Sequence, residues 1–209
     1  MSLPSRFRVR GVFRGAVMRV ARPLASAGVR PNTVTYVTLL FAFLSVLSLL
    51  LFQSQPLYGI CVFLTGFFDG VDGAVSRLRD SASDIGAFTD SVTDKLSEVL
   101  ILFAVPLTYS TQILGLSVGS WALLTLAGWL LTSYTRSRAE ALGVTDLDVG
   151  LGARSERLLT LTVFSLLSLL FWGLVVVTVM GFGTTAYRFY FYRHQIAMSS
   201  PCAGRSTEQ

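Results

Sequence analysis

The sequence predicts an all-α integral membrane protein with six transmembrane helices, preceded by an amphipathic juxtamembrane helix. Of its 209 residues, 52% are hydrophobic and the mean hydropathy is +0.61, which is too apolar for an ordinary soluble domain. Apolar segments of roughly 20 residues, the length that crosses a bilayer, recur along the chain. Lysines and arginines are absent from every second connection between these segments, as in proteins that cross a membrane repeatedly.

Residues 1–31 are basic and amphipathic. Their arginines are Arg6, Arg8, Arg10, Arg14, Arg19, Arg22 and Arg30. Between these, apolar residues recur at intervals of three and four: Val9, Val12, Phe13, Ala16, Val17 and Val20. This pattern predicts a cytoplasmic helix on the membrane surface, where each arginine near anionic headgroups contributes about 1 kcal/mol. Nucleic-acid binding is the alternative, and we expect none because the rest of the chain is apolar.

Residues 32–195 are predicted to form one six-helix membrane domain. The expected helices cover residues 33–52, 57–78, 85–107, 120–142, 158–170 and 172–192. A single helix over 155–193 would be about 58 Å long, far more than the hydrocarbon thickness of about 30 Å, so a turn is expected near residues 171–173. The polar residues 196–209 are predicted to be a disordered tail.

The distribution of positive charge predicts the orientation. The connections at residues 53–56 and 108–119, and the turn expected near Gly173, contain neither lysine nor arginine. Cytoplasmic loops are the ones enriched in these residues. We therefore expect a multi-pass protein of the cell membrane with both termini and the functional site on the cytoplasmic side. Chance segregation of the basic residues is the alternative.

Four aspartates interrupt two of the apolar segments: Asp69, Asp72, Asp90 and Asp94. Each costs roughly 2.5–3.5 kcal/mol near the centre of a membrane helix if nothing neutralises it. Helical spacing places the first two on one face and the last two on another, so opposed helices would form a carboxylate cluster. Carboxylates with no nearby histidine or CxxC motif favour Mg²⁺ or Mn²⁺ over zinc.

The segment from Asp69 to Asp94 reads D-x2-D-G-x2-S-R-x8-G-x3-D-x3-D. It resembles the signature of the CDP-alcohol phosphotransferase family, with Ser76 in place of the usual alanine. The glycines, Gly73 and Gly86, leave room for a ligand beside the helix backbone. The guanidinium of Arg77 can form charge-assisted hydrogen bonds with a phosphate.

This resemblance implies the roles of the site residues. Two Mg²⁺ or Mn²⁺ ions would be bound by Asp69, Asp72, Asp90 and Asp94. The CDP group would be contacted by Asp72, Gly73, Ser76 and Arg77. The family also assigns Asp94 as the base that takes the proton of the acceptor hydroxyl, whereas the residues alone leave all four aspartates as candidate bases.

A second set of basic residues lies near the cytoplasmic ends of the last three predicted helices: Arg136, Arg138, Arg154, Arg157 and Arg188. They can be counter-charges for the acids, but their number indicates an anionic co-substrate such as a phosphorylated alcohol. Residues 133–140 and 154–158 resemble the S-Y-x-K/R-x-R-A-E and R-x-E-R-L segments of the inositol-phosphate branch of the family. That branch comprises bacterial phosphatidylinositol-phosphate and archaeal archaetidylinositol-phosphate synthases.

By this similarity, the phosphate of inositol 1-phosphate would be bound by Arg136, Arg154, Arg157 and Arg188, with Glu140 and Glu156 orienting the arginines. The expected reaction transfers the phosphatidyl-type group of CDP-diacylglycerol or CDP-archaeol to a hydroxyl of inositol 1-phosphate and releases CMP. Glycerol 3-phosphate and serine are alternative acceptors.

Three further interpretations concern the aspartates, the neighbouring charged residues of the third predicted helix, and two small residues of the second. The aspartates can serve a divalent cation transporter, although the fixed glycines and Arg77 argue against it. An ion pair between Lys95 and Glu98 is at least as plausible as a catalytic role for them. The small residues Gly66 and Gly70 make a homodimer plausible without locating its interface.

Overall fold

Helices account for most of the chain that the computed structural model describes, which comprises residues 9–80, 83–147, 149–150 and 152–199. The elements are α1 (Val9–Ser26), α2 (Pro31–Phe52), α3 (Gln55–Leu78), α4 (Asp84–Thr108), β1 (Gln112–Ile113), β2 (Leu116–Ser117), α5 (Val118–Ala141), α6 (Arg154–Leu166) and α7 (Leu170–Ser199). Arg6, Arg8 and most of the predicted tail lie outside the described residues.

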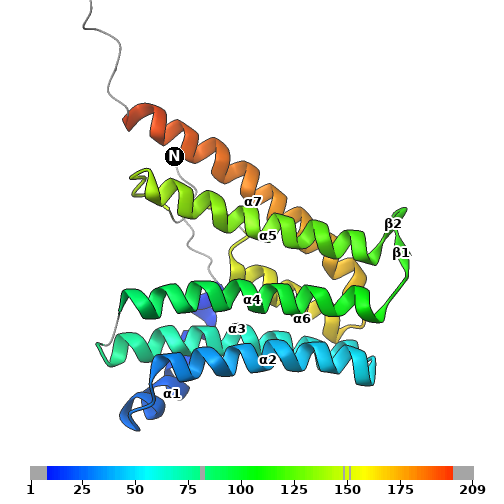
Figure 1. The fold of residues 1–209 in the computed structure, drawn as a ribbon, viewed down its shortest axis with the longest axis horizontal. Coiled ribbons are helices and arrows are strands. Elements are labelled where there is room, and N and C mark those ends of the chain that lie inside the picture. The colour runs from blue at the N-terminus through cyan, green and yellow to red at the C-terminus, as the bar shows by residue number, and fades with distance from the viewer. Residues whose placement is uncertain (1–8, 81–82, 148, 151, 200–209) are drawn as a thin grey trace, which may run out of the picture.

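The helices from α2 to α7 run alternately in opposite directions (Figure 1). The β1–β2 hairpin and the α6–α7 turn lie at one end, and the α3–α4 and α5–α6 connections lie at the other. Helix α2 packs along both α3 and α4, which barely touch each other, while α5 pairs with α7 and α6 lies against α3 and α7. This arrangement leaves a space between α3 and α4, the two helices that carry the aspartates.

Three of the described helices are long and apolar enough to cross a membrane: α2, α3 and residues 170–198 of α7. Helix α6 has 13 residues, so it is about 20 Å long and shorter than a hydrocarbon core of about 30 Å. Among the described residues, the regular structure is helical apart from the short hairpin, as predicted, and six membrane crossings remain a prediction.

The first four predicted membrane helices match α2 to α5 within two residues at each end. Local signals explain this agreement. Helix α4, for example, begins after Ser83, whose hydroxyl accepts a hydrogen bond from the backbone N–H of Gly86 at 3.1 Å. Such a cap stabilises a helix by roughly 0.5–2 kcal/mol. Helix α7 ends later than predicted, because it continues through Ser199.

The connection over residues 108–119, which was expected to be a loop, contains the β1–β2 hairpin. Its turn is made by Leu114 and Gly115, with φ angles of 50° and 78°. Positive φ at both central residues matches the twist of the flanking strands, and glycine adopts it without strain. A two-residue strand has too few residues to show alternation in the sequence, which is why the pattern was missed.

The turn between α6 and α7 was predicted near residues 171–173, and this was wrong. The chain reverses over 167–169, where Ser168 has φ 59°. The backbone N–H of Leu169 donates to Phe164 O at 2.8 Å and that of Ser168 to Ser165 O at 3.0 Å, a pair of bonds that closes a helix end. Glycine usually occupies the left-handed position, so a serine there gave no signal.

Gly173, the residue taken for the turn, instead permits close packing inside α7. A Cβ atom at this position would lie 2.7 Å from Cβ of Phe164 on α6. The absence of a side chain therefore lets the first turns of α7 lie directly against α6.

Helix α1 packs against α3 and exposes a basic face. Ala21 is buried, and Val17 and Val20 are partly buried against it, whereas Arg14 and Arg19 are exposed. Not all of the predicted apolar stripe is covered, since Val12 is 82% exposed. Arg79 follows the C-terminal end of α3, the end predicted to be cytoplasmic. Its guanidinium donates to the carbonyl oxygens of Gly28 and Val29, both at 2.6 Å, and so connects the α1–α2 loop to α3.

Helices α5 and α7 approach closely because small and polar residues line their interface. The hydroxyls of Thr125 and Thr178 are 2.6 Å apart, and the Thr132 hydroxyl lies 2.7 Å from Gly128 O of α5 and 3.1 Å from Gly181 O of α7. A Cβ atom on Gly181 would lie 3.2 Å from the backbone carbon of Gly128. Such small-residue contacts allow helices to associate where apolar burial gives no net advantage.

We predict that Gly181→Ala separates α5 from α7 and lowers the stability of the protein by about 1–3 kcal/mol, the usual cost of overpacking. Gly183→Ala is the matched control, because a Cβ atom there would meet no atom within 4 Å. Thermal unfolding in detergent measures both variants. Equal midpoints for the two would contradict this account of the interface.

Candidate functional site

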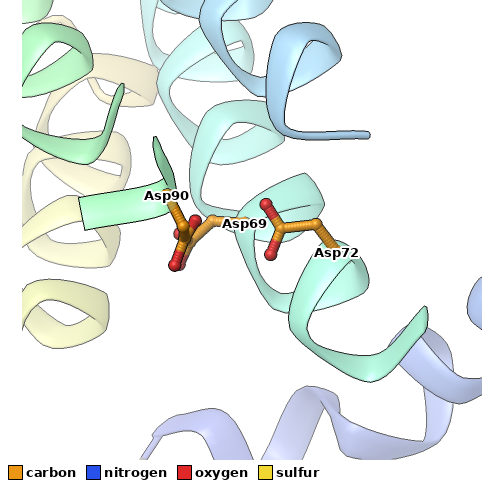
Figure 2. Close-up of side chains that lie close together, drawn as sticks. All are labelled: Asp69, Asp72 and Asp90. Atoms are coloured by element: carbon orange, nitrogen blue, oxygen red, sulfur yellow. The ribbon is translucent and has the colours of Figure 1, made fainter. Parts of the chain in front are cut away.

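Carboxylates from α3 and α4 meet at the space between these helices. One oxygen from each of Asp69, Asp72 and Asp90 lies within 4.8 Å of the others. Asp72 is buried, and the other two are partly buried. Figure 2 shows the Asp69 and Asp90 carboxylates side by side, with Asp72 one turn further along α3. The structure thus brings together three of the four predicted metal ligands.

An α2 residue that sequence reasoning missed contacts this cluster. The Thr35 hydroxyl donates to Asp72 Oδ2 at 3.1 Å and also lies 3.3 Å from Pro31 O. A hydroxyl has one proton, and a carboxylate is the stronger acceptor of the two. Threonines are frequent in α2, so the sequence alone does not distinguish Thr35.

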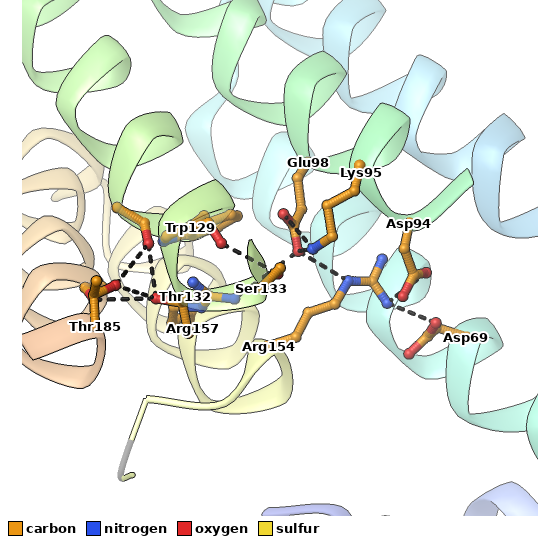
Figure 3. A network of polar contacts seen from close by, with 12 residues as sticks. Asp69, Asp94, Lys95, Glu98, Trp129, Thr132, Ser133, Arg154, Arg157 and Thr185 are labelled. Carbon is orange, nitrogen blue, oxygen red and sulfur yellow. Dashed lines mark hydrogen bonds and ion pairs between the residues drawn. The ribbon is translucent and has the colours of Figure 1, made fainter. Parts of the chain in front are cut away.

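Asp94 lies outside the group of three carboxylates and pairs with an arginine from α6. Nη1 of Arg154 is 2.6 Å from Asp69 Oδ1 and 2.9 Å from Asp94 Oδ1 (Figure 3). The guanidinium therefore bridges the acidic faces of α3 and α4. Metal binding and base catalysis by Asp94 remain predictions.

A cavity of about 620 Å³ opens beside the carboxylates, within the usual size of small-molecule sites. Helices α1, α3, α4 and α6 contribute its walls. Its polar lining includes all four aspartates together with Gly73, Arg14, Arg77 and Arg154. Its apolar lining includes Phe13, Val17, Met18, Phe63 and Phe67. The cavity therefore joins an acidic, arginine-bearing side to an apolar side.

Three of the predicted CDP contacts, Asp72, Gly73 and Arg77, line this cavity, whereas Ser76 is not among its described lining residues. A Cβ atom on Gly73 would lie 3.4 Å from Nη1 of Arg77, so the glycine makes room for the guanidinium. Gly86 is expected to leave room for a ligand, but its nearest neighbour in the structure is a side chain of the protein. A Cβ atom there would lie 3.0 Å from the Ser83 hydroxyl that caps α4.

The four arginines predicted to bind the acceptor phosphate have different surroundings. Arg154 lines the cavity. Arg157 is 2% exposed, with its guanidinium carbon 4.9 Å from the centroid of the Trp129 ring. Arg188 donates to Val149 O at 3.0 Å and to Thr132 O at 2.7 Å, which fixes the segment before α6. Arg136 is exposed on α5.

Gly66 and Gly70, the small residues considered for a dimer, face other helices of the same chain. A Cβ atom on Gly66 would lie 3.3 Å from Leu158 of α6, and one on Gly70 would lie 3.5 Å from Val17 of α1. Both glycines also line the cavity. Their small size therefore serves packing and space within one molecule.

Comparison with known proteins identifies the family. The family model described as CDP-alcohol phosphatidyltransferase matches residues 28–180. An archaetidylinositol phosphate synthase of Pyrococcus horikoshii is 32% identical over 191 residues, which cover 91% of this chain and 98% of that protein. A phosphatidylinositol phosphate synthase of Cutibacterium acnes is 29% identical over 155 residues, covering 70% of this chain and 72% of that one.

Solved structures show the same fold. A crystal structure of Mycobacterium tuberculosis phosphatidylinositol phosphate synthase with CDP-DAG bound matches with a TM-score of 0.69 at 22% identity, covering 92% of this chain and 98% of that chain. A structure of the same enzyme in complex with manganese and citrate matches with a TM-score of 0.72 at 23% identity, covering 92% and 93%. Because the family model spans most of its length and a relative is similar over nearly all of it, this chain belongs to the CDP-alcohol phosphatidyltransferase family.

Proposed function

We propose that this enzyme transfers the phosphatidyl-type group of a CDP-linked lipid to a hydroxyl of inositol 1-phosphate and releases CMP. The observation that carries the proposal is the meeting of carboxylates from α3 and α4 beside Arg77 and Arg154 in one cavity. The relatives named above, archaetidylinositol and phosphatidylinositol phosphate synthases, support the acceptor. Family membership leaves the transporter alternative without support.

Divalent metal ions fit the carboxylate cluster. Asp69, Asp72 and Asp90 offer only oxygen ligands, which Mg²⁺ and Mn²⁺ prefer. The related structure that contains manganese supports this choice. We propose two ions, with Asp94 as the fourth ligand. Divalent ions held by these carboxylates would neutralise charge on the diphosphate of the CDP-lipid and on the departing CMP phosphate.

Other side chains around the cavity would bind the nucleotide and accept the proton of the acceptor hydroxyl. Arg77 would form charge-assisted hydrogen bonds with the CDP phosphates, beside Asp72, Gly73 and Ser76. The carboxylate of Asp94 would accept the proton of the acceptor hydroxyl. The oxygen that loses this proton forms the new bond to phosphorus, and the bond from phosphorus to the CMP oxygen breaks.

The acceptor phosphate would be bound on the α6 side of the cavity. Arg154 already faces the cavity, and Arg157 lies one turn further along α6. We propose that Arg136 and Arg188 complete this set. An inositol phosphate placed there has its hydroxyl groups toward Asp94 and its phosphate toward the arginines.

The protein is a membrane protein, given its family and its three long apolar helices. We propose that α4, α5 and α6 also lie in the bilayer, so that the chain is multi-pass with six crossings and has both termini in the cytoplasm. The apolar wall made by Phe13, Val17 and Phe63 would contact the lipid chains of the CDP-linked substrate. A homodimer, if formed, uses a face other than Gly66 and Gly70.

The acceptor is tested by competition. Purified protein, Mg²⁺ and either CDP-diacylglycerol or CDP-archaeol are incubated with radiolabelled inositol 1-phosphate, glycerol 3-phosphate and serine. We expect the labelled inositol phosphate lipid to be the main product, with CMP released only when both substrates are present. Preferential use of serine would refute the proposed acceptor.

Asp94→Asn should lower kcat by about 10²–10⁴-fold, the usual contribution of a general base. Most Mn²⁺ and nucleotide binding should remain, because Asp69, Asp72 and Asp90 are intact. Asp80→Asn is the control, since Asp80 is exposed in the α3–α4 connection. Retained turnover in the Asp94 variant would remove this residue from the base role.

Thr35→Val should weaken Mn²⁺ binding by about 10–100-fold, as expected when a hydrogen bond to a metal-ligating group is lost. Thr38→Val is a matched control: Thr38 is also buried in α2, but its hydroxyl donates to Val34 O. Electron paramagnetic resonance titration with Mn²⁺ gives both dissociation constants. Similar values for the two variants would show that Thr35 does not orient Asp72.

A further inference from the structure

We infer that Glu98 is a positioning residue that orients Arg154 and Arg157 for binding the acceptor phosphate; this inference rests on the proposed function. Glu98 is fully buried on α4 and one helical turn beyond Asp94. Residues spaced by four lie on the same helix face, so Glu98 continues the face of Asp90 and Asp94 away from the carboxylate cluster.

Three cations surround the Glu98 carboxylate. Lys95 Nζ is 2.9 Å from both of its oxygens, Arg154 Nε is 3.3 Å from Oε1, and Arg157 Nη2 is 4.0 Å from the same oxygen (Figure 3). Lys95 alone would satisfy the charge of a structural ion pair. Arg154 is also paired with Asp69 and Asp94, so Arg157 is the cation beside Glu98 whose guanidinium has capacity for a further anion.

The contacts of Arg154 define the orientation of its guanidinium. Its Nη1 faces Asp69 and Asp94, while its Nε faces Glu98. A planar guanidinium held at two edges has little freedom to rotate. Glu98 therefore determines which edge of Arg154 is directed toward the catalytic carboxylates.

Arg157 has buried donors that are available for a ligand. Its guanidinium carbon lies 4.9 Å from the centroid of the Trp129 ring, its Nη2 is 4.0 Å from Glu98 Oε1, and the residue is 2% exposed. Among the described residues, no acceptor bonds its Nε or Nη1, although both atoms are buried. Buried polar groups nearly always have a partner, so a missing one indicates a ligand. A phosphate monoester has the charge and the acceptor oxygens for this position.

Glu98→Gln tests the inference, because it keeps the size of the side chain and removes the charge that holds both arginines. We expect the KM for the acceptor to rise by up to about 10²-fold, as misplaced binding groups produce. The KM for the CDP-lipid should change little, since the proposed nucleotide contacts lie on α3. Glu98→Asp should restore part of the acceptor affinity.

Lys95→Met separates this role from a simple ion pair. It removes the partly exposed lysine but leaves Glu98 with both arginines, so the acceptor KM should stay near that of the wild type. The double variant Lys95→Met/Glu98→Gln has no unpaired charge between these two positions, yet it should keep the raised acceptor KM. Recovery in the double variant, or equal effects of the two single changes, would overturn the inference.

Inorganic phosphate provides a test that does not depend on turnover. Calorimetric titration of phosphate into the purified protein should give a higher dissociation constant for Glu98→Gln and an unchanged one for Asp80→Asn, which alters an exposed carboxylate in the α3–α4 connection. Unchanged phosphate binding in Glu98→Gln would refute the positioning role. If the wild type instead bound phosphate but used another phosphorylated acceptor, only the choice of inositol phosphate would be wrong.

Discussion

The mutual repulsion of aspartates placed between two apolar helices is the constraint on which this structure depends. Asp69, Asp72 and Asp90 each bring a carboxylate oxygen within 4.8 Å of the others, in surroundings that screen charge less than water does. Such a cluster is stable only with cations beside it. Arg154 supplies one from within the chain, and the proposed divalent ions would supply the remaining positive charge for the reaction.

The packing of the helices is compatible with this requirement. Helix α2 supports α3 and α4 from one side, so that the two acidic helices need not touch, and the side chains gain room between them. Helix α6 brings Arg154 and Arg157 to the opposite side. Arg188 of α7 bonds the segment that leads into α6, so the position of the α6 arginines also depends on the last helix. Residues far apart in the sequence therefore determine together how the charges of the aspartates and arginines are balanced at the site.

The sequence predicted the helices best where they are long and apolar, and α2 to α5 agree closely with the structure. It failed where a single residue decides the geometry: Ser168 in place of a glycine moved the α6–α7 turn, and the short hairpin carried no periodic signal. At the site, the spacing of acids within α3 and α4 was enough to predict faces that meet. The contacts of Thr35 and Glu98 depend on which helices become neighbours, which spacing along one helix does not encode.

The arginines also show that the sequence does not predict which residues become interaction partners. Their number indicated an anionic ligand, but Arg157 and Arg188 are buried among Trp129 and backbone carbonyls, and Arg154 lies against aspartates. The charge of a residue is readable from the sequence, whereas its partner is a property of the packing. An orienting role for Glu140 and Glu156 stays a prediction, and the structure adds Glu98, whose carboxylate contacts both Arg154 and Arg157.

The start of α6 at Arg154 affects how water-soluble molecules approach. Arg154 is level with Asp69 and Asp94, so the chain reaches the depth of the carboxylates before it becomes helical. Non-helical backbone at such depth is tolerated only where protein buries it or where it borders an aqueous space. With the bilayer placement proposed above, a charged sugar phosphate that approached past Gly152 and Ala153 would meet peptide groups and the Arg154 guanidinium rather than hydrocarbon.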